Sequence, residues 1–65
     1  MNYYTLLVKY PEGWEIAFGD YDHETVADEA RDTYLDQPTK IIMSEDDTAS
    51  LNRACARVIP DWKAV

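Results

Sequence analysis

Short apolar runs separated by turn residues divide the 65-residue chain into five predicted elements. Residues 3–10 and 14–18 alternate their side chains between two faces and are rich in aromatic and β-branched residues, which is typical of strands. Between them, Pro11-Glu12-Gly13 supplies a fixed φ and then a residue that tolerates positive φ. The pattern therefore predicts a β-hairpin, and residues 39–44 predict a third strand.

The segment after the hairpin predicts a helix from about His23 to Leu35. Asp22 is suited to the N-cap position because its carboxylate can accept the free amide hydrogens of the first turn. Pro38 prevents the helix from continuing. The expected apolar stripe consists of Val26, Ala27, Ala30 and Tyr34.

A second helix is predicted between the acidic turn at residues 45–47 and Pro60. Asp46, Asp47 and Thr48 are all candidates for its N-cap. Its apolar positions follow the i, i+4, i+7, i+8 spacing of a helix with one buried face. These positions are Leu51, Ala54, Cys55, Val58 and Ile59.

The element order ββαβα predicts a single α+β domain over residues 1–65. A right-handed crossover through the first helix places the third strand beside the first, giving an antiparallel sheet of order 2-1-3. We expect a two-layer sandwich with both helices on one face of this sheet. The other face would then be open and rather apolar, with Tyr3, Thr5, Leu7, Ala17 and Ile42 exposed.

The chain is strongly acidic: it has thirteen acidic residues, six basic residues and a net charge of −7. Such an excess repels nucleic acid and anionic membranes and attracts basic partners, although it can also serve solubility alone. The single Cys55 cannot form an internal disulfide. No basic-then-apolar leader and no apolar run long enough to span a bilayer is present, so a cytoplasmic location is expected.

Acidic residues concentrate in the first predicted helix and its flanks. Glu24, Asp28, Asp32 and Asp36 recur every fourth residue, which places them in one row on one helix face. Such a row could present carboxylates where a basic groove expects phosphates; alternatively it is a solvated face neutralised by Arg31 or by arginines of the second helix. The candidate partner-binding surface comprises Asp20, Asp22, Glu24, Asp28, Glu29, Asp32, Asp36, Glu45, Asp46 and Asp47.

No constellation of residues predicts catalysis, a metal site or a cofactor. The lone His23 and Cys55 are thirty-one residues apart along the chain and are expected to be a surface histidine and a core cysteine. Asp20-x-Asp22-x-Glu24 resembles the start of a calcium loop, but Thr25 and Arg31 stand where such a loop requires glycine and a bidentate glutamate. We therefore expect a protein that is not an enzyme.

The N-terminal 26 residues resemble a group of small phage and prophage proteins. The resemblance is carried by the YTLLV strand at Tyr4–Val8, the G-x-W turn at Gly13–Trp14 and the FGDYD-x-E-T-V segment at Phe18–Val26. It implies a mobile-element origin and transfers no catalytic residue. Small acidic phage proteins include inhibitors of host defence, among them anti-CRISPR and anti-restriction proteins, and some of these mimic DNA.

Two functions are therefore expected as alternatives. The first is a phage-encoded, non-catalytic inhibitor whose acidic surface blocks DNA binding by a basic host defence complex, with a CRISPR surveillance complex as the favoured partner. The second is a protein–protein interaction module or regulator that works through the open apolar sheet face, as a monomer or a homodimer. Neither requires the chain itself to bind nucleic acid or a membrane.

Overall fold

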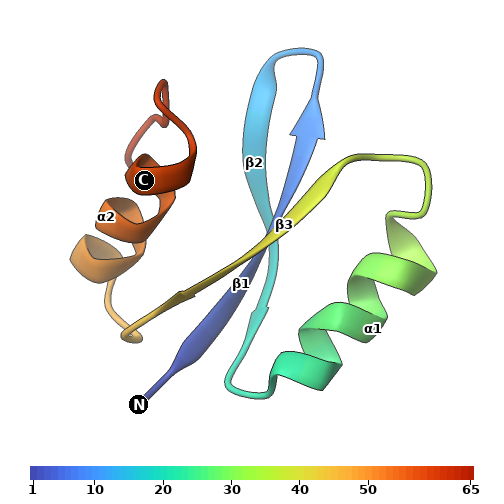
Figure 1. Ribbon diagram of the computed structural model, residues 1–65, viewed down its shortest axis with the longest axis horizontal. Coiled ribbons are helices and arrows are strands. Elements are labelled where there is room, and N and C mark those ends of the chain that lie inside the picture. Colours follow the sequence, from blue (N-terminus) through green and yellow to red (C-terminus); the bar gives the residue numbers. More distant parts are fainter.

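The computed structural model describes all 65 residues and contains the five expected elements in the expected order. The elements are β1 (Tyr3–Tyr10), β2 (Gly13–Asp20), α1 (His23–Thr33), β3 (Thr39–Ser44) and α2 (Thr48–Val58). The strands form one antiparallel sheet of order β2-β1-β3, so the predicted α+β fold and strand order are confirmed. Figure 1 shows the sheet between the two helices.

The predicted placement of both helices on one face is wrong, because the helices cover opposite faces of the sheet (Figure 1). Leu6 and Val8 of β1 pack with Val26 of α1. Their strand neighbour Leu7 points the other way and packs with Cys55 of α2. The result is a three-layer arrangement in which each face of the sheet has its own small core.

The central strand explains this arrangement. Its residues Thr5 to Val8 are four consecutive buried positions, each no more than 1% exposed. Successive strand residues point to opposite faces, so a continuous buried run requires cover on both sides. The eleven residues of α1, which form the crossover between β2 and β3, cover one face, and α2 follows β3 onto the other.

The open apolar face expected from the sequence is therefore not present. Leu7 and Ile42 are buried beneath α2, with Ile42 only 8% exposed, and Thr5 is buried as well. A β-bulge in β2 also shifts the alternation of side chains between the two faces. The neighbours Leu6 and Leu7 of β1 pair with Phe18 and Ile16, and Ala17 is left without a partner in β1. Ala17 and Phe18 consequently both pack towards the α1 core, although strict alternation had put them on opposite faces.

Both helix starts follow local capping rules. The Asp22 carboxylate accepts the backbone N–H of Thr25 at 3.2 Å, as expected for an N-cap. Among the three candidates for the second cap, the structure selects Asp47, which accepts the backbone N–H of Ser50 at 2.8 Å.

The helix ends depart slightly from the expected limits. α1 ends at Thr33 with Tyr34 as its C-cap, two residues before the expected end, and Leu35 is left 79% exposed. In α2 the expected stripe member Val58 is 47% exposed, whereas Ile59, just past the helix, is buried. Thus the buried face of α2 runs from Leu51 through Cys55 to Ile59.

Candidate acidic interaction surface

The outer face of α1 carries three exposed carboxylates that we call the acidic ridge: Glu24, Asp28 and Asp32. Val26 and Ala30, on the opposite side of the helix, pack against the sheet and so orient the ridge towards solvent. At about 1.5 Å of rise per residue, the three positions span roughly 12 Å. The ridge is thus shorter than the expected row of four.

Asp36 does not belong to the ridge. It lies in the turn between the end of α1 and Pro38, where the chain no longer has helical geometry. The N–H of the C-cap residue Tyr34 still bonds to the carbonyl of Ala30 at 3.2 Å, and the regular four-residue spacing stops there. Asp36 is exposed and adds negative charge near this end of the helix without continuing its line.

One ridge residue is already paired inside the molecule. Asp28 accepts a hydrogen bond from the Arg31 guanidinium in an exposed i, i+3 ion pair. Surface pairs of this kind contribute little to stability because both groups remain solvated. Glu24 and Asp32 have no hydrogen-bond or ion-pair partner, so the partial neutralisation expected from Arg31 is confined to Asp28.

The remaining basic residues do not neutralise the ridge. Arg53 and Arg57 lie on α2, on the opposite side of the sheet, and Arg53 donates instead to the Ser50 hydroxyl at 3.1 Å. Lys9 and Lys40 both approach the Trp14 ring, with their Nζ atoms 5.9 and 5.4 Å from its centroid. Trp14 packs on the α2 side, so these lysines also lie away from α1.

Negative charge is consequently concentrated in one segment of the chain. Residues 20–36, which include α1, hold seven acids and one arginine. The rest of the chain holds six acids and five bases, and is nearly neutral. Residues 20–36, which comprise α1 and its flanks, therefore account for −6 of the net charge of −7.

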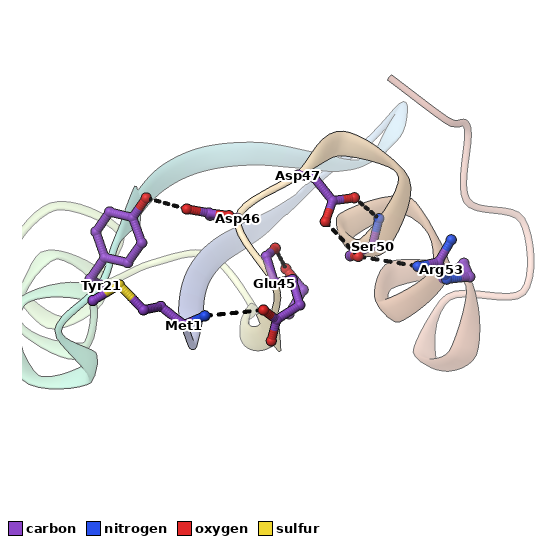
Figure 2. Close-up of polar contacts among 8 residues, drawn as sticks. Met1, Tyr21, Glu45, Asp46, Asp47, Ser50 and Arg53 are labelled. Atoms are coloured by element: carbon purple, nitrogen blue, oxygen red, sulfur yellow. Dashed lines mark hydrogen bonds and ion pairs between the residues drawn. The ribbon is translucent and has the colours of Figure 1, made fainter.

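The other predicted acids lie where β2 and β3 end, at the same end of the sheet and on either side of the start of β1. Figure 2 shows the partners of Glu45, Asp46 and Asp47. The Tyr21 hydroxyl donates to Asp46 at 2.7 Å and joins the loop before α1 to the turn before α2. The N-terminal ammonium of Met1 pairs with Glu45 at 3.0 Å. Asp20 accepts the backbone N–H of Asp22 at 2.9 Å.

These contacts perturb the ionisation of several groups. The hydrogen bond from the Thr25 hydroxyl, followed by the one from its backbone N–H, lowers the pKa of Asp22. The Ser50 backbone N–H, followed by its hydroxyl, lowers the pKa of Asp47. The pKa of Tyr21 is raised because its hydroxyl donates to Asp46.

The ten predicted site residues therefore fall into two groups. Six serve as caps, turn acceptors or ion-pair partners within the chain, and four have no partner. The six are Asp20, Asp22, Asp28, Glu45, Asp46 and Asp47. The four are Glu24, Glu29, Asp32 and Asp36, of which Glu29 is half-buried on the flank of α1.

The capping role of Asp22 and Asp47 gives a pH prediction. Their pKa values are lower in the folded state, so each carboxylate stabilises the fold above the ordinary aspartate pKa of about 3.9, and this contribution is lost as the pH falls below it. We expect the thermal midpoint of the wild type to fall more steeply between pH 5 and pH 3 than that of the Asp22→Asn/Asp47→Asn variant. Asparagine also caps helices but does not titrate, so equal slopes in circular dichroism melts would contradict the assignment.

The lone histidine and the lone cysteine lie apart. His23, in the first turn of α1, makes an edge-to-face contact with Tyr4, with ring centroids 5.2 Å apart. Cys55 is buried under α2 on the opposite side of the sheet, and burial raises the pKa of its thiol. The structure therefore does not bring the histidine and the cysteine together.

No group of three or more His, Cys, Asp and Glu side chains is arranged to hold a metal ion. Neither helix combines the length and apolar composition that a bilayer span would need. Comparison of the chain with protein-family models, with curated proteins and with solved structures gave no match. The fold and the site define a small α+β domain whose first helix, with its flanking loops, is strongly acidic.

Proposed function

We propose that this protein is a phage-encoded, non-catalytic inhibitor that occupies the basic DNA-binding groove of a host defence complex, in the first instance a CRISPR surveillance complex. The observation that carries the proposal is the uneven distribution of charge: the acidic residues of α1 and its flanks have one base among them, Arg31, and the other five bases lie outside this segment. A partner would therefore meet an acidic surface with little interruption.

The acidic ridge supplies the phosphate-like contacts in this proposal. Glu24 and Asp32 have no internal partner, so lysine or arginine side chains of a DNA-binding groove can pair with them directly. Asp28 can join them once Arg31 turns away, since their exposed ion pair costs little to break. Glu29 on the flank of α1 and Asp36 in the turn after it add negative charge beside the ridge.

The acids at the end of the sheet have a supporting role. Asp20, Asp22 and the turn at residues 45–47 keep their negative charge while they hold the loop and the helix starts in place. Their field adds to that of the ridge, which steers a basic partner towards this side of the molecule. Their removal would disturb the fold as well as the charge, so they are poor positions for a first test.

A DNA competition experiment tests the proposal. Purified defence complex is mixed with labelled target DNA, and the protein is added as wild type or as the Glu24→Gln/Asp28→Asn/Asp32→Asn variant. We expect the wild type to displace DNA and the amide variant to fail, because the exchange removes charge while nearly preserving side-chain shape. Equal displacement by both proteins would contradict the role of the ridge, and displacement by neither, with an intact fold, would contradict inhibition of that complex.

A matched control separates local from overall charge. Glu12→Gln/Glu15→Gln/Asp61→Asn also removes three negative charges, but from exposed positions outside α1. We expect this variant to keep most of the competing activity. If both triple variants lost activity alike, net charge rather than the ridge would be responsible.

A further inference from the structure

The largest hollow in the molecule lies beside the β-hairpin and is separate from the acidic ridge. It has a volume of about 710 Å³ and runs between the start of β2 and the C-terminal segment. Trp14 and Ile16 line it from β2, and Trp62 and Val65 from the segment that follows α2. We call this hollow the tryptophan groove.

The far wall of the groove is held in place by one side chain. The Asn52 carboxamide oxygen accepts the indole N–H of Trp62 and the backbone N–H of Val65, both at 3.1 Å. Its NH₂ group donates to the Val65 carbonyl at 3.2 Å. The backbone N–H of Trp62 also bonds to the Ile59 carbonyl at 3.1 Å, so the groove is formed before any partner arrives.

The near wall is an edge of the sheet. β2 pairs with β1 on one side only, so alternate N–H and C=O groups along its other side have no strand partner. The bulge at Ala17 interrupts the regular edge, which leaves residues 13–16 as the stretch beside the groove. An extended segment can add to such an edge by main-chain hydrogen bonds.

The side chains around this edge indicate the chemistry of the partner. Trp14 and Ile16 face the groove, and Ile16 is 40% exposed, so they offer apolar contact to every second residue of an added strand. Glu15 points to the other face, and both it and Glu12 lack an ion-pair partner. Among the residues that line the groove, Lys63 is the one base. Lys9 and Lys40 approach the Trp14 ring from β1 and β3, which lie on the other side of β2 from its free edge.

We propose that the tryptophan groove binds an extended protein segment in which apolar and basic residues alternate. The segment adds to β2 as a fourth strand, with its apolar side chains against Trp14, Ile16 and Trp62 and its basic side chains near Glu12 and Glu15. A second copy of the chain fits less well, because pairing two β2 edges would bring the same carboxylates together. The groove is a second interaction site and does not depend on the function proposed for the acidic ridge.

Trp14 and Trp62 are the only tryptophans in the chain, and both line the groove, so intrinsic fluorescence reports on it directly. The probe is a synthetic octapeptide of alternating valine and lysine. We expect saturable binding with a blue shift of the emission. An octapeptide of alternating valine and glutamate, and a valine–lysine peptide N-methylated along one edge, should not bind, because one has the wrong charge and the other cannot pair as a strand.

Variants test the assigned side chains. Glu12→Gln/Glu15→Gln should weaken valine–lysine peptide binding about tenfold, which corresponds to the loss of two exposed charge pairs. Ile16→Lys should weaken it at least as much. The ridge variant Glu24→Gln/Asp28→Asn/Asp32→Asn should bind the peptide as the wild type does, even where it fails in DNA competition.

Several results would overturn the inference. These are an absence of saturable binding at millimolar peptide, equal binding by the N-methylated peptide, or a loss of binding in the ridge variant rather than in the Glu12/Glu15 variant. Concentration-dependent dimerisation in sedimentation experiments, if abolished by Ile16→Lys, would instead assign the groove to a second copy.

Discussion

Leu6→Ala and Leu7→Ala are each expected to lower the free energy of unfolding by about 2–5 kcal/mol, the usual cost of removing a fully buried leucine side chain. Both side chains are fully buried, although they are neighbours in one strand and point to opposite faces. The prediction therefore tests whether both faces of the sheet are covered. In a two-layer sandwich, one of the two leucines would point to an uncovered face, and its substitution would lower the free energy of unfolding only slightly.

Leu35→Ala is the matched control, because Leu35 is 79% exposed and its truncation should change stability by about 0.5 kcal/mol or less. A domain of this size has a small reserve of stability, so either core variant could be largely unfolded at room temperature. Denaturant melts in a stabilising osmolyte keep the comparison measurable. A large loss for one leucine and a loss like that of Leu35 for the other would contradict the three-layer arrangement.

Milder substitutions probe the two cores separately. Ile42→Val removes one methylene from the core beneath α2 and should cost about 0.5–1.5 kcal/mol. Val26→Ala truncates the side chain that α1 buries against Leu6 and Val8 and should also be destabilising. These variants are expected to remain folded.

Much of the fold follows from local sequence rules. The turn at Pro11–Gly13, the cap at Asp22 and the end of helix α1 before Pro38 are all encoded within a few residues, so the elements and the strand order could be predicted. Helix placement could not be predicted in the same way, because it depends on which faces of β1 need cover. The uninterrupted apolar run Leu6-Leu7-Val8 is the signal that pointed to burial on both faces.

The candidate site could be predicted only in part, because local spacing shows neither where a helix ends nor which side chains pair within the fold. Four-residue spacing locates a row of acids on a helix, but it does not say where the helix ends, and Asp36 lies beyond that end. Nor does it say which carboxylates are used internally: the partner of Asp46 is Tyr21, twenty-five residues away. The tryptophan groove joins the hairpin to the C-terminal segment, so no local pattern predicts it.

If the acidic ridge binds a basic groove, the loss of its three charges is expected to weaken that binding about a thousandfold. A hydrogen bond to a charged group contributes about 1.5–3 kcal/mol, and three such contacts at the lower end exceed the roughly 4 kcal/mol that a thousandfold change requires. Titration calorimetry with the purified partner would measure the change for Glu24→Gln/Asp28→Asn/Asp32→Asn. A loss of less than tenfold would place the binding energy elsewhere.

Arg31→Gln supplies a control of opposite sign. It removes the one basic side chain of α1 and frees Asp28 from its ion pair, so binding to a basic partner should become several-fold tighter. The ridge variant should also depend less steeply on salt than the wild type, because fewer charges are screened between 50 and 500 mM. If Arg31→Gln weakened binding instead, the guanidinium itself would contact the partner, and an uninterrupted acidic ridge would be the wrong description of the interface.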